Sequence, residues 1–355
     1  MGEDMKMTSS KMDMAPSMMD MKMGMMDMAR EKDLAGSFFP FDQGKPPMLP
    51  PHGIAGRVLS TSGLPIANAT VEVFGRDGQA LAGAVMTNAQ GEYTLELDPT
   101  GLVTVRIAAD GYARGHERLK IREGTTSALV TRMSPLAPAI AIDVATGGEV
   151  VSLNGFALDV PAGAFVKENG AAVSGSVDVH VTPLDRRTLS EVLAHPSDFI
   201  GRTADNVSVS LRAASSVDIT VLQGDERLKL ADGKVIEATL PFLDESAPED
   251  GILAYAYDEV SGIWREEGQA VYDTNTRSFT LDILKLSYWM AASNIYDDTC
   301  LQSTLVDKDG NPLGGVQVRS LLLDEEDRGF SFTTNSDKDG NFAIVWKKLS
   351  RLKLQ

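Results

Sequence analysis

The chain has 355 residues, a formal net charge of −17 at pH 7 and one cysteine. Its length allows two or three domains of ordinary size. Its acidity argues against nucleic acid as a partner, because phosphate contacts need a basic surface. One cysteine excludes an intrachain disulfide, and the sequence shows neither an apolar run of membrane-spanning length nor a visible signal peptide.

Residues 1–52 are predicted to form a disordered arm that is rich in methionine and then in proline. Of the sixteen methionines, twelve lie in the first 28 residues. Thioethers are soft, neutral ligands that select Cu(I) or Ag(I), so the arm predicts a Cu(I) site. Its candidate ligands are Met5, Met7, Met12, Met14, Met18, Met19, Met21, Met23, Met25, Met26 and Met28. Three other interpretations stay open: a low-complexity tail, an oxidant-absorbing tract and a tail that binds hydrophobic surfaces.

Two segments of the chain, residues 53–135 and 297–355, carry the same pattern. Each has a short alternating strand, a Gly-x-Pro turn, a second strand, and a polar turn closed by Gly91 or Gly340 before an aromatic residue. A spacing repeated within one chain predicts one small β-sandwich built twice. The second copy has little sequence after Phe342, and we therefore expect it to be a truncated module.

The region between the repeats, residues 147–294, consists of short alternating segments separated by Gly, Asp-Gly and Ser-Gly turns. This pattern predicts a β domain in two parts, 147–212 and 213–294, with a helix at 187–195 as the one exception. No segment of the chain sustains a 3.6-residue apolar period. The predicted fold class is therefore all-β, with tandem sandwich modules around a larger two-part β domain.

The two repeats resemble the carboxypeptidase regulatory-like domain, a transthyretin-like or immunoglobulin-like β-sandwich. In the first copy the residues that carry the resemblance are Gly63-Leu64-Pro65 and Gly91-Glu92-Tyr93, and in the second they are Gly310-Asn311-Pro312 and Gly340-Asn341-Phe342. The middle region resembles the β domain of cartilage intermediate layer proteins, through VPAGAF at 160–165 and SGIW at 261–264. These resemblances imply a non-enzymatic protein that is secreted or held in the cell envelope.

Two DKDG runs, at 307–310 and 337–340, invite a calcium interpretation. An EF-hand loop needs glycine at its sixth position, whereas here glycine arrives fourth. Asp-Gly is also a strong turn signal by itself. We therefore predict turns at both places.

Catalytic motifs are missing from the sequence. The four histidines have no metal-site spacing, and no nucleophile elbow or phosphate-binding glycine loop is present. Trp264, Tyr288 and Trp289 would suit a sugar platform, but in a chain with few aromatic residues we predict that they pack in the core. Cys300 is likewise predicted to be a small buried side chain.

The sequence thus predicts a structural or adhesive protein, not an enzyme, whose modules act as spacers or binding platforms. Surface proteins or glycans are the expected partners. The alternatives are Cu(I) or Ag(I) sequestration by the arm and carbohydrate binding by a sandwich, the latter based on fold-level likeness alone.

Overall fold

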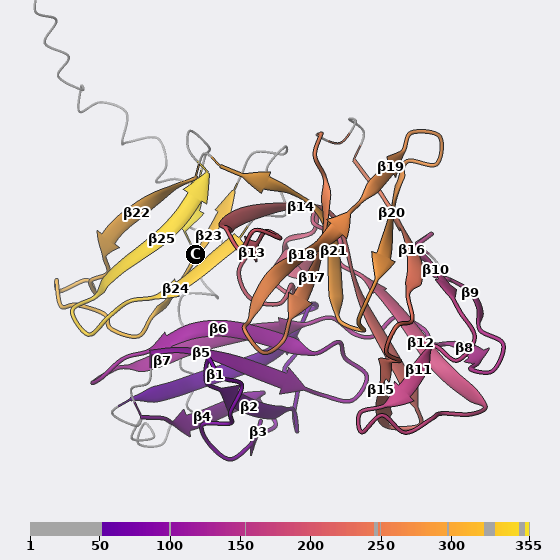
Figure 1. Ribbon diagram of the computed structural model, residues 1–355. Coiled ribbons are helices and arrows are strands. Elements are labelled where there is room, and N and C mark those ends of the chain that lie inside the picture. Colours follow the sequence, from indigo (N-terminus) through magenta and orange to yellow (C-terminus); the bar gives the residue numbers. More distant parts are fainter. Residues whose placement is uncertain are drawn as a thin grey trace, which may run out of the picture. The chain divides into compact units, whose positions relative to one another are not determined.

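The computed structural model describes residues 52–98, 101–152, 154–244, 248, 250–296, 298–322, 331–347 and 352–354. Over these residues the protein is nearly all β, with one short helix (Figure 1), which confirms the predicted fold class. That helix, α1 (Leu189–Val192), is shorter than the predicted 187–195. No described helix is long and apolar enough to cross a membrane. The predicted arm lies outside the described residues, except for His52.

The first module is a sandwich of two sheets, drawn in indigo to purple in Figure 1. Its three-stranded sheet has the order β4 (Glu92–Glu96), β1 (Gly53–Ser60), β7 (Thr126–Met133). Its four-stranded sheet has the order β3 (Val85–Met86), β2 (Thr70–Phe74), β5 (Gly101–Ala108), β6 (Gly115–Ile121). Alternate residues of these strands, among them Val58, Val71 and Val105, are buried between the sheets, as period-two patterning requires.

The middle region contains a five-stranded and a nine-stranded sheet. The smaller sheet has the order β19 (Val271–Asp273), β20 (Ser278–Ile283), β16 (Ile236–Pro241), β10 (Ala157–Val160), β9 (Gly148–Val151). The main path of the larger sheet has the order β11 (Phe165–Lys167), β15 (Glu226–Leu230), β14 (Ser208–Gln223), β13 (Ile200–Arg202), β18 (Ile263–Gln269), β17 (Leu253–Asp258), β21 (Tyr288–Ile295). Strand β12 (Ser176–Pro183) joins it by pairing with β14 and with β8 (Ile140–Asp143).

Strand β14 ties the middle region together. It runs for 16 residues and pairs with β12, β13, β15 and β21. The predicted division at residue 212 falls inside this strand, so residues on both sides of that position share one sheet. One face of β14 carries Val217, Ile219 and Val221, which belong to the large apolar core of this region.

The second module repeats the turns of the first. Its strands are β22 (Asp298–Thr304) paired with β25 (Asn341–Lys347), and β24 (Ser331–Asn335), β23 (Gln317–Leu322) and β26 (Leu352–Leu354) in one sheet. The side chains of Thr87 and Ser336 make the same two hydrogen bonds, one from a backbone N–H and one to a carbonyl across the turn.

Gly91 and Gly340 occupy matching positions in the two modules. Each has a positive φ, 74° and 78° respectively. A Cβ on Gly91 would lie 2.4 Å from Val58 O, and one on Gly340 would lie 2.3 Å from Leu305 O. Only glycine accepts both the backbone conformation and this close approach, which explains why the repeated pattern keeps it.

Candidate functional site

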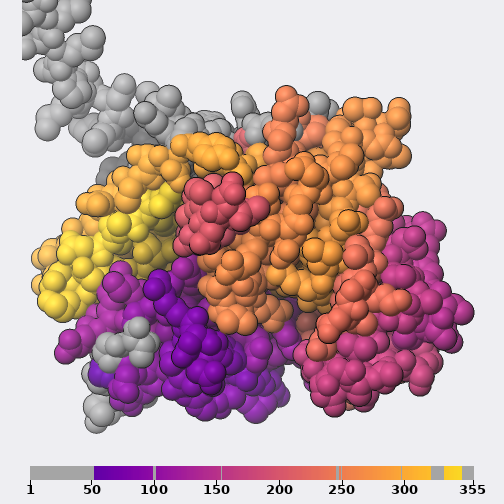
Figure 2. Space-filling view, in the orientation of Figure 1, coloured from indigo at the N-terminus to yellow at the C-terminus, as the bar shows by residue number. Residues whose placement is uncertain are grey.

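The described part of the chain buries many polar side chains where the modules meet. Figure 2 shows indigo and purple atoms of the first module against orange atoms of the middle region and yellow atoms of the second module. Strand β6 is central to these contacts, because both His116 and Glu117 on it are buried. We call the group formed by Arg114, His116, Tyr257, Glu259 and Tyr288 the histidine cluster.

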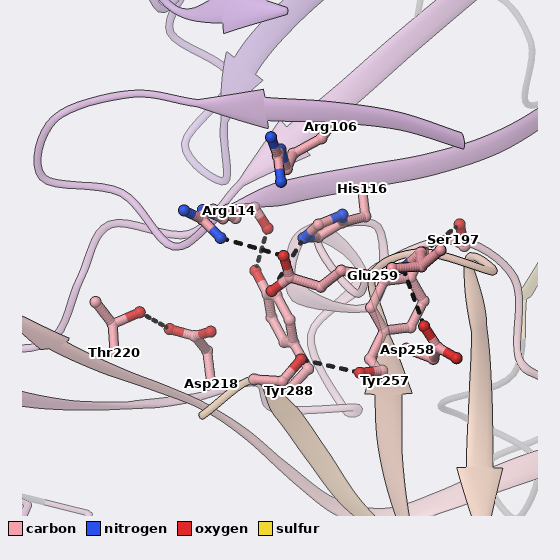
Figure 3. Close-up of polar contacts among 12 residues, drawn as sticks. Arg106, Arg114, His116, Ser197, Asp218, Thr220, Tyr257, Asp258, Glu259 and Tyr288 are labelled. Carbon is pink, nitrogen blue, oxygen red and sulfur yellow. Dashed lines mark hydrogen bonds and ion pairs between the residues drawn. The ribbon is translucent and has the colours of Figure 1, made fainter. Parts of the chain in front are cut away.

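The histidine cluster joins the first module to the middle region (Figure 3). The Glu259 carboxylate lies between two side chains of the first module: Oε2 is 3.1 Å from Arg114 Nη1 and Oε1 is 3.8 Å from His116 Nε2. Tyr288 Oη donates a hydrogen bond to the Arg114 carbonyl at 2.7 Å. The ring centroids of His116 and Tyr257 are 5.1 Å apart. The cluster therefore combines an ion pair, a hydrogen bond and ring packing.

Burial decides the protonation of His116. It lowers the pKa of this histidine to about 4, although Glu259 acts in the opposite direction. For Glu259, burial alone would raise the pKa, but Arg114, Arg227 and the protonated form of His116 hold it below the usual value. At pH 7 His116 is thus neutral and Glu259 is ionised. The His116 side chain is fully buried and neither ring nitrogen has a hydrogen-bond partner in the described chain, so its described contacts are ring packing against Tyr257 and the approach of Glu259.

A second polar surface, on strand β14, is also covered. Ser216, Asp218 and Thr220 alternate with the apolar residues of this strand and are all buried. Asp218 Oδ2 accepts a hydrogen bond from Thr220 Oγ1 at 2.7 Å. Burial raises the pKa of Asp218, while Arg227 opposes the shift. This side of the strand would face solvent in an isolated sheet.

Glu117, Asp198 and Arg319 form a second buried group, which we call the carboxylate cluster. They come from the first module, the middle region and the second module respectively. Glu117 Oε1 lies 3.8 Å from Arg319 Nη2, and Asp198 Oδ1 accepts a hydrogen bond from the Thr333 N–H at 2.6 Å. Burial raises the pKa of Glu117 and that of Asp198 to about 7 each. Three parts of the chain thus meet at two carboxyl groups.

Backbone groups extend the contact between the first and second modules along β7. The Ala128 N–H donates to Gly315 O at 2.7 Å, and Asn335 Nδ2 donates to Ala128 O at 2.8 Å. Arg122 Nη1 donates to Asn335 O at 2.8 Å. The second module therefore satisfies both backbone groups of Ala128, within β7.

The segment between β7 and β8 is held by both bodies that it connects. The Leu136 N–H donates to Gly111 O at 2.8 Å in the first module. The Ala137 N–H donates to Thr182 Oγ1 at 3.1 Å, and Ala137 O accepts from His180 Nδ1 at 2.7 Å. The connection is therefore fixed by hydrogen bonds at consecutive residues.

The sequence-based expectations for single residues have different outcomes. Trp264, Tyr288 and Trp289 are almost completely buried, as predicted, and offer no exposed sugar platform. The prediction for Cys300 is wrong: its side chain is exposed, because β22 lies open to solvent along most of its length. The candidate copper ligands, Met5 to Met28, lie outside the described residues.

The two DKDG runs form turns. Asp307 Oδ1 accepts hydrogen bonds from the backbone N–H groups of Asp309 and Asn311, and Asp337 Oδ1 accepts the matching pair from Asp339 and Asn341. The leading carboxylate of each run is therefore engaged in its own turn. No group of three or more His, Cys, Asp or Glu residues suited to a metal ion occurs in the part of the chain that the structure describes.

Strands β1 to β7 and their turns correspond to a known family. Residues 53–134 match the carboxypeptidase regulatory-like domain. The predicted resemblance of the first module is thereby confirmed. This module supplies Arg114 and His116 to the histidine cluster and Glu117 to the carboxylate cluster.

The chain is also similar to cartilage intermediate layer proteins. It is 29% identical over 123 residues to cartilage intermediate layer protein 1 of Sus scrofa, covering 34% of this chain and 20% of that protein. It is 28% identical over 241 residues to cartilage intermediate layer protein 2 of Homo sapiens, covering 62% of this chain and 20% of that protein. The chain thus spans about a fifth of the length of these two relatives.

Solved structures with some likeness include β proteins of Bacillus. The Bacillus anthracis TIE protein matches with 13% identity and a TM-score of 0.22, over 86% of this chain and 45% of that chain. BcpA, the major pilin subunit of Bacillus cereus, matches with 10% identity and a TM-score of 0.22, over 85% of this chain and 87% of that chain.

Proposed function

We propose that the protein is a non-enzymatic structural component of the extracellular space or the cell envelope. Its β modules act as stiff spacers that present their loops to surface proteins or glycans. Two similarities support the location and the assignment to structural proteins: the one to cartilage intermediate layer proteins and the match to the carboxypeptidase regulatory-like domain. The burial of His116 supports a non-catalytic role for the most conspicuous titratable group.

The main support for the spacer role is that the segment between β7 and β8 is hydrogen-bonded to the bodies on both sides of it. A flexible linker has solvated backbone groups, whereas here Leu136 and Ala137 are hydrogen-bonded to the bodies on either side. The ion pair between Arg114 and Glu259 adds a second attachment across the same joint. Orientation between the two bodies is thereby restricted.

Hydrogen exchange on the full chain tests this stiffness. We expect the amides of Leu136 and Ala137 to be protected about as strongly as those of core strand β1, because opening them requires the joint to separate. Exchange at open-chain rates, with β1 still protected, would contradict the spacer role.

The location is tested by antibody labelling of intact and permeabilised source cells, together with fractionation of the medium. We expect the protein on intact cells or in the medium. Labelling that appears only after permeabilisation would contradict the proposed location, and it would leave the proposed stiffness of the connection between the first module and the middle region unaffected.

A second proposed function is binding of Cu(I) or Ag(I) by the arm, supported by the concentration of twelve methionines in 28 residues. An anaerobic Cu(I) titration against a chromophoric chelator tests it on the full chain. The matched variant replaces the methionines from Met5 to Met28 with leucine, which keeps the apolar character and removes the sulfur. We expect several Cu(I) ions bound by the natural sequence alone, and equal stoichiometry would exclude the arm as the site.

A further inference from the structure

Four arginines line one hollow between the first module and the middle region. The hollow has a volume of about 230 Å³. Arg76 follows strand β2 and Arg118 lies on β6, whereas Arg202 ends β13 and Arg265 lies on β18. Ser261, in the turn before β18, also lines it. We call this feature the arginine hollow.

The lining of the arginine hollow is positively charged, in contrast to the acidic chain as a whole. The whole chain has a net charge of −17, yet no carboxylate belongs to the lining. Arg265 is paired, with Nε 2.6 Å from Asp258 Oδ2, while Arg202 donates to the neutral Asn206 carbonyl at 2.8 Å. Arg76 is exposed and pairs with no carboxylate of the described chain.

The arginines also act on one another. Burial lowers the pKa of Arg118, and Arg76 and Arg202 lower it further, while Asp198 is the nearby carboxyl that opposes them. Like charges held this close repel one another unless a counter-charge lies among them. The geometry thus favours a negatively charged occupant.

One buried donor in the arginine hollow, Arg118 Nε, has no hydrogen-bond partner in the described chain. The Ser261 side chain interacts with Asp258, and Thr104 Oγ1 donates only a long hydrogen bond of 3.5 Å to Val260 O. Gly262 lets the turn before β18 approach strands β5 and β6 closely. A Cβ at this position would lie 2.8 Å from Thr104 Oγ1 on β5 and 3.4 Å from Arg118 Cδ on β6. A buried donor without a protein partner is rare in folded proteins, and a bound ion or water can supply the acceptor.

A larger hollow in the middle region shows the ordinary arrangement. It measures about 390 Å³ and also contains arginines. There Arg187 Nη2 lies 2.7 Å from Asp185 Oδ2, and Arg186 pairs with Asp244. Both of these arginines are thus paired with a carboxylate, whereas in the arginine hollow Arg265 alone of the four has such an ion pair among the described residues.

We propose that the arginine hollow binds a compact oxyanion: a sulfate, phosphate or carboxylate group, either as a free ion or at the end of an acidic sugar. Guanidinium groups match such anions through paired N–H donors. A long polyanion is disfavoured, because the acidic surface elsewhere would repel it. The occupant would touch Arg118 from one body and Ser261 from the other, so it would also hold the joint together. This site does not depend on the spacer role proposed above.

Calorimetric titration of the full chain tests the proposal, with sodium sulfate, sodium phosphate and sodium glucuronate as probes. Sodium chloride at the same ionic strength is the reference. We expect at least one oxyanion to bind and to raise the melting temperature, since a ligand of the folded state stabilises it. Binding of glucuronate that sulfate displaces would assign the group to an acidic sugar, whereas binding of sulfate or phosphate alone would assign it to the free ion. Both results support the site.

Two variants and a matched control localise the binding. Arg76→Gln removes an exposed side chain and should leave folding intact, while Arg118→Gln removes the buried donor. Each is expected to weaken the affinity about tenfold or more, the effect of losing a charge-assisted hydrogen bond. Lys120→Gln, an exposed position on the same strand as Arg118, makes the same charge change outside the hollow and should alter affinity by less than about twofold. Failure of all three anions to bind beyond the chloride reference would overturn the proposal, and so would equal losses in Arg76→Gln and Lys120→Gln.

Discussion

Glu117 on β6 and Arg319 on β23 face each other across the contact between the two modules, with Oε1 and Nη2 3.8 Å apart. Their side chains are 5% and 13% exposed, so water screens the pair little. Burial nevertheless outweighs the attraction of Arg319 and raises the pKa of Glu117 to about 7. A carboxyl group in this position changes its charge within the neutral range, and Asp198 beside it does the same.

The free energy of unfolding of the natural protein is expected to fall as the pH rises, and Asp198→Asn is expected to reduce this dependence on pH. Burial raises the pKa of Asp198 to about 7 in the folded state, whereas the unfolded chain titrates near 3.9. Between these values the folded state binds more protons, so the stabilisation is complete below pH 4 and is lost as the pH rises through 7. Asparagine stays neutral and keeps an acceptor for the Thr333 N–H. The variant should gain about 2 kcal/mol relative to the natural protein between pH 5 and pH 8, measured by urea unfolding. Asp205→Asn, an exposed position, is the control, and parallel pH profiles for the Asp198 variant and the natural protein would contradict the assignment.

His116→Leu is expected to protect the protein against mild acid. Burial lowers the pKa of His116 to about 4, while the unfolded value is near 6.5. The unfolded chain therefore binds more protons between these values, and stability is lost as the pH falls from about 6.5 towards 4. Leucine has a similar size and removes two buried nitrogens without hydrogen bonds. We expect the melting temperature at pH 7.5 to change little. At pH 5 we expect the melting temperature of the variant to be higher than that of the natural protein. An identical loss on acidification in both proteins would contradict this.

Gly91→Ala and Gly340→Ala are expected to destabilise their own modules by more than the strain of a positive φ alone. That strain is about 1–2 kcal/mol for a residue with a Cβ, and here the Cβ also meets a carbonyl oxygen at less than 2.5 Å. Gly124→Ala is the matched control, because its φ is 66° but no atom lies within 4 Å of its Cβ. Denaturant unfolding of the three variants separates strain from collision. Equal losses at all three positions would show that the close approach is unimportant.

Trp289→Ala is expected to reduce the free energy of unfolding by about 3–5 kcal/mol. The side chain is fully buried in the core of the middle region, and its Nε1 donates a hydrogen bond to Lys285 O at 2.9 Å. Tyr296→Ala removes an aromatic ring that is 78% exposed and should cost less than about 0.5 kcal/mol. Chemical denaturation measures both. A small loss for Trp289→Ala would place this ring outside the packed core.

The repeated turns could be predicted because their causes are local. Gly91 and Gly340 are required by backbone conformation and close contact within one turn, and such requirements leave a pattern in the sequence. The all-β class follows in the same way from alternating side chains such as Val217, Ile219 and Val221. Both conclusions need no knowledge of distant segments.

The buried clusters could not be predicted in this way. The alternation of Ser216, Asp218 and Thr220 with apolar residues is typical of a strand with one solvated face. Other segments cover that face: Ser216 is hydrogen-bonded to the Leu184 carbonyl and to His195 Nε2, both from the middle region. One indication was available in β6, where Glu117 shares its side of the strand with the buried Leu119 and Ile121. A carboxylate in phase with core residues indicates a buried partner, but the partner, Arg319, lies about two hundred residues away in the chain.

The exposure of Cys300 provides an experimental handle. Because it is the one thiol in the sequence and is exposed on β22, a maleimide dye or spin label attaches to the natural protein at a single defined place on the second module. A second cysteine introduced at exposed Lys120 on the first module would then complete a pair whose separation reports the distance between the two modules. A narrow distance distribution at pH 5 that broadens at pH 8 would make the titration of Glu117 and Asp198 visible as movement.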